Sequence, residues 1–476
     1  MMKTLDQVKQ TLVEKLHDPA DLMTRSFAYQ GQEGFIIYLN TLVDEQWLED
    51  TFFDPLLNDE MLVEPLIKKL AAVDLEELPT IDACIPLFWK GRYVIVYDKK
   101  PIQLIAVKTP VYLNRSIEEP INDRALRGAH DGFVESLTTN LSLVRRHGLL
   151  ESLTIKKIEV GGSLKQEVAL VYVEGQVDKV ILQKVTKRLS NIKEELISSP
   201  GTINELLQDS KRSFFPQILY TERPDSVVGN IAEGRIALLI EGNPTALILP
   251  VSFFSFLQAV DDYNVHFVLG SFIRLIRTMA LVISILLPSL YISLVAFHFE
   301  IIPQPLVISV KSSLQNIPYP PLIEALIMEF TIELIREAGL RLPAPIGQTI
   351  GIVGGLVIGE AVVNAGLVSN IMIIVVAVTA ISSFVIPSPE MSAVIRLTRF
   401  PLMVAAATFG LIGVILSFFV ILMHLIKLES FGTPYMTPIA PFKRAGLKDT
   451  IVRFPLWMIQ RHTSMASTKP TKSPTK

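Results

Sequence analysis

Residues 278–299 read TMALVISILLPSLYISLVAFHF and contain no Lys, Arg, Asp or Glu. Their length matches the roughly 20 residues that a helix needs to cross a bilayer. Arg274 and Arg277 come just before this stretch, as is typical of a cytoplasmic flank. Pro288 in its middle predicts a kink, which neighbouring helices tolerate in a membrane. The sequence therefore predicts a membrane protein with its first span at 278–299.

Further apolar segments follow and define a transmembrane domain over residues 278–426. We expect additional spans at 346–368, 371–386 and 401–426. Residues 320–342 are too charged to cross alone, so they predict an amphipathic helix, lying at the interface or lining a wet cavity. The charges that we single out on this helix are Glu324, Glu329, Glu333, Arg336 and Glu337.

Four spans would place both ends of the domain on the cytoplasmic side, in agreement with the flanking basic residues. Arg396 and Arg399 do not fit this arrangement, because they would lie in an outside loop. Either the number of helices differs by one, or that loop folds back into the membrane. Residues 427–476 predict a basic, partly disordered cytoplasmic tail.

The segment 346–368 has two distinct sides when it is drawn as a helix. One side carries glycines at every fourth position, which is typical of close helix packing. These glycines are Gly347, Gly351, Gly355 and Gly359. Four residues lie opposite the middle of the stripe, within about 60° of one another. They are Thr349, Val353, Glu360 and Asn364.

This second side of the glycine-rich segment is the candidate functional face. A carboxylate at mid-membrane is costly unless it meets water or a partner. One interpretation is a wet surface, either an ion path or a substrate cavity. The other is a buried helix contact in which Glu360 is paired or protonated. The residues favour neither interpretation.

The first 245 or so residues carry charges throughout and predict a soluble region. The N-terminus lacks the apolar core of a secretory signal, and the only cysteine, Cys84, cannot form a disulfide within the chain. Both features favour a cytoplasmic location. The net charge of −3 argues against nucleic acid as a partner.

Two pairs of similar segments indicate a duplication in this region. GFIIYLNTLVDE at 34–45 matches VALVYVEGQVDK at 168–179, and a helical pattern follows each. GRYVIVYDKKPIQLIAV at 91–107 matches GRIALLIEGNPTALILP at 234–250, and both read as hairpins. We expect two related α/β subdomains at 1–130 and 131–252, followed by a membrane-entry linker at 253–277. Chance similarity between two ordinary α/β units is the alternative.

The sequence gives little support to a catalytic function. The seven histidines are scattered, without an HExxH motif or a tight cluster of acids. The glycine-rich segment lacks the Gly-Lys-Ser/Thr ending of a phosphate-binding loop. We therefore expect no enzyme activity, no metal and no cofactor.

Long ordered motifs carry a family resemblance over nearly the whole chain. They include DGFVESLTTNLSLVRR (131–146), FFPQILYTERPD (214–225), EGRIALLIEGNP (233–244), RFPLMVAAATFGLIG (399–413) and FGTPYMTPIAPF (431–442). On these motifs the chain resembles the A subunit of GerA-type spore germinant receptors of endospore-forming bacteria. It departs from the family pattern at Val144–His147 and at Asp261–Phe267. We interpret these departures as marks of one subgroup of receptors, which would include accessory relatives without nutrient binding.

The resemblance implies a place in the spore inner membrane, with the N-terminal region toward the spore core. It implies a receptor that contains a transporter-like B subunit and a lipoprotein C subunit, with contacts to membrane lipid and none to nucleic acid. A nutrient would trigger germination through a homo-oligomer of A subunits that releases cations. Two rival functions remain: a secondary transporter of a small solute, and an accessory germination protein without nutrient sensing.

Overall fold

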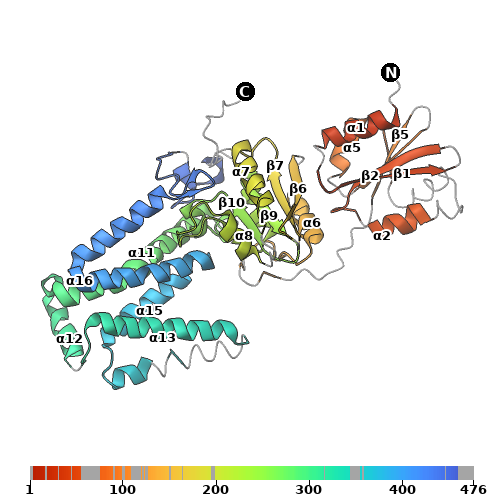
Figure 1. Cartoon of the computed structure of the whole chain (residues 1–476). Coiled ribbons are helices and arrows are strands. Elements are labelled where there is room, and N and C mark those ends of the chain that lie inside the picture. Colours follow the sequence, from red (N-terminus) through yellow and green to blue (C-terminus); the bar gives the residue numbers. More distant parts are fainter. Residues whose placement is uncertain are drawn as a thin grey trace. The chain divides into compact units, whose positions relative to one another are not determined.

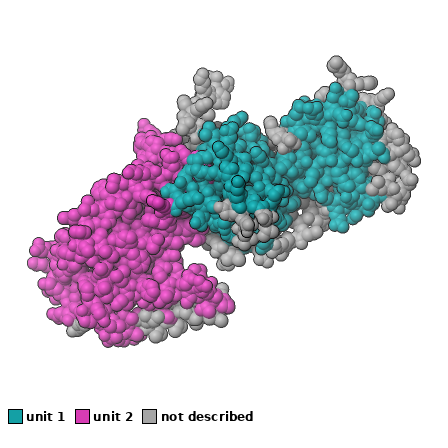
Figure 2. Space-filling view, in the orientation of Figure 1, with its two compact units in different colours: residues 1–211, 218–250, 461–476 teal, residues 212–217, 251–460 magenta. Residues whose placement is uncertain are grey.

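The computed structural model describes most of the chain and divides it into two compact units (Figure 2). Unit 1 comprises 1–211, 218–250 and 461–476, and unit 2 comprises 212–217 and 251–460. The described residues are 4–16, 19–29, 32–43, 45–54, 75–88, 92–98, 102–108, 119–120, 123, 127–148, 152–162, 165–193, 199–315, 317–343, 354–355, 359–444 and 446–458.

The first sheet of unit 1 has five antiparallel strands in the order β1-β2-β4-β5-β3. The strands are β1 (Leu22–Tyr29), β2 (Gln32–Leu39), β3 (Leu75–Leu78), β4 (Arg92–Tyr97) and β5 (Gln103–Lys108). The helices beside this sheet are α1 (Leu5–Lys15), α2 (Glu45–Leu48), which continues as a π-helical turn over Glu49–Phe53, and α5 (Ile81–Phe88).

Both faces of this sheet are covered by helices (Figure 1). Successive side chains of a strand point to opposite faces, so β2 contributes side chains to the hydrophobic cores on both sides of the sheet. Ile36 and Tyr38 pack with the α2 side, whereas Phe35 and Ile37 pack with α1 and α5. The continuous apolar run in β2 is explained by this double burial.

The second sheet repeats this plan in the order β6-β7-β9-β10-β8. Its strands are β6 (Leu153–Val160), β7 (Gln166–Val173), β8 (Leu219–Thr221), β9 (Ile236–Ile240) and β10 (Ala246–Leu249). The helices around it are α6 (Leu137–His147), α7 (Lys179–Ser190), α8 (Pro200–Leu207) and α9 (Pro224–Ala232).

The two sheets share strand order and pairing register. Numbered within each sheet, both orders read first, second, fourth, fifth and third strand. Ile37 pairs with Val94 in the first sheet, and Val171 pairs with Ala237 in the second. The two pairs of similar segments match Ile37 with Val171 and Val94 with Ala237, so the same two positions pair in both sheets. The prediction of two related α/β subdomains is therefore confirmed.

One buried ion pair joins the two halves of unit 1. Arg145 of α6 donates from Nε and Nη2 to the two carboxylate oxygens of Asp21, at 2.8 and 2.7 Å. Thr41 Oγ1 donates to the same carboxylate at 2.7 Å, and the Ala20 amide donates to the Ile155 carbonyl at 3.0 Å. The predicted subdomains thus belong to one compact unit.

Unit 2 is mainly helical. It begins with a 3-10 turn at Phe253–Leu257 and continues through α10 (Asp261–Asn264), α11 (Phe267–Phe297), a 3-10 turn at Phe299–Ile301 and α12 (Gln304–Leu314). Then follow α13 (Pro321–Arg341), α15 (Asn370–Phe384) and α16 (Pro389–Lys427). Among the described residues, α11 and α16 are long and apolar enough to cross a membrane, by length and composition.

The helix α11 begins earlier than the span predicted at 278–299. It starts at Phe267, after His266 accepts a hydrogen bond from the Val268 amide as N-cap. The predicted linker at 253–277 is therefore mostly helical. Arg274 and Arg277 are accommodated within α11 because both contact the buried carboxylate of Asp262.

The helix α16 also differs from the predicted span at 401–426. It begins at Pro389 and breaks at Gly410, whose φ of 61° and ψ of −142° are not helical. The chain turns back there and brings Gly413 so close to the first arm that a Cβ at this position would lie 2.1 Å from the Ala405 carbonyl oxygen. The ribbon of α16 shows this reversal (Figure 1). Two arms, 389–409 and 411–427, thus replace one long helix.

The chain after α16 folds as part of unit 2 as far as the structure describes it. The tail predicted to begin at residue 427 is therefore ordered over its first part. β11 (Glu429–Ser430) and β12 (Thr433–Pro434) form a small hairpin. Tyr435 Oη donates to the Pro216 carbonyl at 2.6 Å, and Ser430 Oγ donates to the Gln217 carbonyl at 2.8 Å. The low-complexity end of the chain lies outside the described residues.

Candidate functional site in the helical unit

A buried ion pair links α13 to the first arm of α16. Arg399 Nη1 lies 2.6 Å from Glu329 Oε2, and both side chains are only 1% exposed. One turn further along α13, Glu333 Oε1 lies 2.9 Å from Arg396 Nε. Buried charges of this kind require partners, because an isolated ion in an apolar interior is very costly.

Arg336 extends this charge network to α15. Its guanidinium donates to Ser383 Oγ at 3.2 Å and lies over the ring of Phe384, 4.4 Å from the centroid. It also lies 3.9 Å from Glu333. Cations at three positions thus converge on two carboxylates, and together they hold α13, α15 and α16.

The buried network explains why Arg396 and Arg399 were difficult to place from sequence. Both residues lie inside a helix, not in an outside loop. The charged side of α13 therefore forms helix contacts at Glu329 and Glu333. Glu337 differs, since it is exposed and pairs with Arg341 at 2.6 Å within the same helix.

Glu324 lies in the first turn of α13 and is fully buried. Its Oε2 accepts a hydrogen bond from the Ser369 amide at 2.8 Å, at the beginning of α15. The Oε1 atom has no hydrogen-bond partner among the described residues. The helix dipole favours a negative charge at this position. Glu324 thereby connects α13 to the start of α15.

The glycine-rich segment between α13 and α15 is described only in part. Gly347, Thr349, Gly351 and Val353 lie outside the described residues. Residues 359–364 are helical, and both Glu360 and Asn364 are exposed. A Cβ built at Gly355 or Gly359 would meet no atom within 4 Å. In the described part of the chain, these two glycines therefore make no close helix contact, and the predicted packing role remains a prediction.

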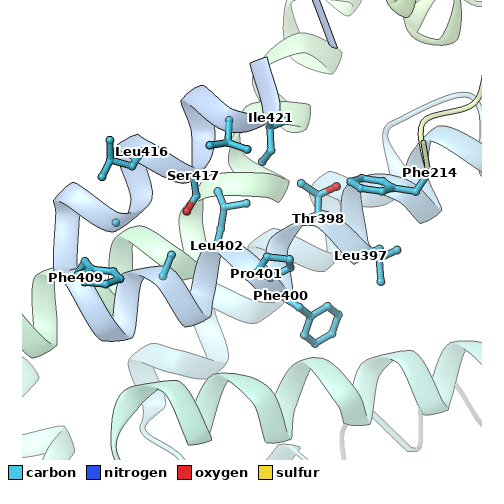
Figure 3. A pocket seen from close by; sticks show the side chains of 13 residues that line it. Phe214, Leu397, Thr398, Phe400, Pro401, Leu402, Phe409, Leu416, Ser417 and Ile421 are labelled. Carbon is cyan, nitrogen blue, oxygen red and sulfur yellow. The ribbon is translucent and has the colours of Figure 1, made fainter. Parts of the chain in front are cut away.

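A cavity of about 600 Å³ lies between the two arms of α16, beside Phe214 (Figure 3). Apart from the hydroxyls of Thr398 and Ser417, the side chains around it are apolar. Phe214 reaches the cavity because Phe214 and Phe215 both pack on the His424 ring, whose Nε2 lies 2.8 Å from Ser213 Oγ. The cavity depends on the reversal at Gly410.

A second buried charge cluster lies at the beginning of α11. Asp262 is fully buried and pairs with Arg274 at 2.9 Å and with Arg277 at 2.8 Å. Arg274 also contacts Asp449, and Arg453 donates to the carbonyl of Asp262. This cluster fastens the C-terminal segment to the first turns of α11.

The family model described as Bacillus/Clostridium GerA spore germination protein matches residues 10–465. The chain belongs to the GerA family. Spore germination protein B1 of Bacillus subtilis is 37% identical over 466 residues, which cover 97% of this chain and 96% of that protein. Spore germination protein GerLA of Bacillus cereus is 35% identical over 473 residues, which cover 98% and 96%.

One solved structure is also similar to this GerA-family chain. It is the N-terminal domain of the A subunit of the Bacillus megaterium spore germinant receptor GerK3, 26% identical with a TM-score of 0.41. The alignment covers 52% of this chain and 95% of that domain. Taken together, the family match and the full-length relatives confirm the resemblance inferred from the motifs.

Sequence reasoning about this GerA-family chain missed both buried charge clusters. Glu329 and Arg399 are 70 residues apart, and Asp449 reaches Arg274 from 175 residues away. The available signal was indirect. Arg396 and Arg399 stood where charges were unexpected, which is the usual sign of a buried partner in a membrane segment.

Proposed function

We propose that this chain is the A subunit of a nutrient germinant receptor in the inner membrane of the dormant spore. In this proposal it assembles with copies of itself and releases cations early in germination. Its full-length relatives are named spore germination proteins. The two membrane-length helices α11 and α16 support a place in a bilayer.

The exposed turn at 359–364 carries the proposal. Glu360 and Asn364 are exposed, and Gly355 and Gly359 have open space around them. A carboxylate in a membrane domain needs water or a protein partner. Neighbouring copies of the chain would cover the glycine side and leave Glu360 and Asn364 along a wet path for cations.

The buried contacts of α13 would hold this segment in place. Glu324 binds the start of α15, so the helix that precedes the glycine-rich segment is attached to the helix that follows it. Glu329 attaches the same helix α13 to α16. A shift of α13 would move the segment as well. A ligand shifts such a two-state assembly through its different affinity for the two states.

Two further subunits complete the proposed receptor. A transporter-like B subunit would bind the nutrient, and a lipoprotein C subunit would complete the complex. The doubled α/β region of the A subunit would face the spore core and supply contacts between subunits.

Alanine substitution in the candidate face tests the ion path. Spores with Glu360→Ala or Val353→Ala should release cations more slowly when the nutrient is added, as measured by potassium release from spores with equal receptor levels. Glu300→Ala is the matched control, because Glu300 is exposed after the end of α11. Unchanged release in both test variants would contradict the proposal.

Reconstitution separates this function from its rivals. Passive cation flux in liposomes that contain the complete chain supports a channel. Saturable solute uptake would instead indicate a transporter. The absence of both activities would indicate a scaffold. Deletion of the gene, followed by a panel of nutrients, would identify the germinant by the response that is lost.

A further inference from the structure

The C-terminal segment Gly446–Met458 is fixed against the first turns of α11. Ser271 Oγ donates to the Arg453 carbonyl at 2.7 Å, and Arg453 Nη1 donates to the Val265 carbonyl at 2.8 Å. Arg274 Nη1 binds Asp449 Oδ1 at 2.7 Å. These contacts place the segment where α11 begins, at one end of a helix that is long enough to cross a bilayer.

An exposed apolar stripe runs along the same part of α11. The spacing of its residues puts them within about 100° of one another on the helix. They are Val268, Phe272, Leu275, Ile276 and Met279, all more than two-fifths exposed. Such a stripe on a membrane-length helix is suited to contact with lipid chains.

Exposed aromatic and apolar side chains of the C-terminal segment lie beside the first residue of α11. The ring of Trp457 lies 5.9 Å from the ring of Phe267, yet Trp457 is 79% exposed. Met458 and Phe454 are also exposed. Tryptophan is enriched where a bilayer meets water, because its ring is apolar and its indole N–H needs a polar partner.

Basic side chains accompany these apolar ones. Arg444 and Lys448 are exposed and Lys443 is half-buried, and Lys448 Nζ lies 3.3 Å from the Met458 carbonyl. From Met436 to the end, the chain has eight Lys and Arg residues and a single acid, Asp449. Asp449 is already paired with Arg274. The surface therefore offers an excess of positive charge.

We propose that residues 442–458 form an interfacial anchor that binds the headgroups of anionic phospholipids. Trp457 and its apolar neighbours would sit at the level of the headgroups, and Lys443, Arg444 and Lys448 would bind lipid phosphate. Basic clusters beside a membrane helix attract anionic lipid in this way. The anchor requires that α11 crosses the membrane, and it does not depend on cation release.

Trp457 itself can report on the anchor. The chain has three tryptophans, so Trp47→Phe and Trp89→Phe leave Trp457 as the only one. The full-length variant is reconstituted in phosphatidylcholine or phosphatidylglycerol bilayers that contain lipids brominated at known depths. We expect the strongest quenching from bromines nearest the headgroup. Quenching by aqueous acrylamide, with none by brominated lipid, would overturn the proposal.

Charge variants test the preference for anionic lipid. Brominated phosphatidylglycerol should quench Trp457 at a concentration at least about fivefold lower than brominated phosphatidylcholine, because each of the three basic contacts contributes about 1 kcal/mol and one alone gives this factor. Lys443→Gln, Arg444→Gln and Lys448→Gln together should bring the two concentrations close to each other.

The matched control changes the same number of charges elsewhere. Lys156, Lys179 and Lys187 are exposed in unit 1, and their replacement by Gln should leave the lipid preference unchanged. Equal quenching by the two lipids in the chain with unaltered charges would overturn the assignment to anionic lipid. An unchanged preference in the anchor triple variant would overturn the role of its three residues.

Discussion

At the scale of single residues, the charges of unit 2 include both deeply buried ion pairs and freely exposed ones. Glu329 and Arg399 represent the first kind, and Glu337 and Arg341 the second. The difference is energetic. Exposed pairs contribute little, whereas removal of one partner from a buried pair leaves an uncompensated charge in an apolar interior.

We predict that Glu329→Gln lowers the free energy of unfolding by about 3–5 kcal/mol. The reason is that Arg399 keeps its charge and loses its nearest carboxylate, at 2.6 Å, while Glu333 remains at the longer distance of 4.0 Å. Unfolding of the complete chain in detergent measures the loss. Glu337→Gln is the control, with an expected cost below about 1 kcal/mol. Equal effects of the two variants would show that burial of the pair does not matter.

The single cysteine gives a second prediction at this scale. Burial, together with the nearby carboxylate of Asp82, raises the pKa of the Cys84 thiol to about 12. Only the thiolate reacts rapidly with alkylating reagents. At pH 8 we therefore expect almost no labelling by iodoacetamide in the folded chain, and complete labelling after unfolding, as measured by mass spectrometry. Rapid labelling of the folded chain would contradict the burial of Cys84 in α5.

At the scale of elements, the reversal at Gly410 determines the shape of α16. Gly410 has a positive φ, and a Cβ there would lie 2.8 Å from the His298 ring. Gly413 allows the second arm to cross the carbonyl of Ala405 at close range. The cavity beside Phe214 exists because the two arms separate beyond this crossing.

We predict that Gly413→Ala destabilises the chain by about 1–3 kcal/mol, because the added methyl group collides with backbone. Gly339→Ala in α13 is the matched control. A Cβ at Gly339 meets no atom within 4 Å, and alanine favours a helix by about 1 kcal/mol over glycine. Thermal unfolding of both variants in detergent tests the prediction, which fails if Gly413→Ala is as stable as the unaltered chain.

At the scale of the whole molecule, unit 1 is built from two copies of one strand plan, and Asp21 joins them. The carboxylate of Asp21 is fully buried and receives hydrogen bonds from Arg145 and Thr41. Asp21→Asn should cost about 3–5 kcal/mol and increase hydrogen exchange in both sheets. Asp54→Asn, at an exposed position, should change stability by less than about 0.5 kcal/mol. Exchange that stays slow in both sheets of the Asp21 variant would rule out this coupling.

Local patterns in the sequence were enough to predict much of this molecule. The tyrosine-centred strands β2 and β7 and the two hairpins were visible because a strand repeats every two residues and a tight turn has its own residues. The first β-strand of each sheet and the short strands β3 and β8 were missed. β3 and β8 have only four and three residues, too few to show a period.

The duplicated α/β region and the apolar helices could be predicted from the sequence, because composition and periodicity are properties of neighbouring residues. The long ordered motifs carried the resemblance to the GerA family, which the family match confirmed. Which charges pair with one another depends instead on how the helices and strands pack. Glu329 pairs with Arg399, Asp21 pairs with Arg145, and the C-terminal segment contacts the start of α11, in each case across many intervening residues. Residues 278–297 of the apolar stretch thus belong to a longer helix that begins at Phe267, and the two flanking arginines are buried partners of Asp262. Such pairings depend on the direction in which each helix packs, and no local repeat in the chain specifies that direction.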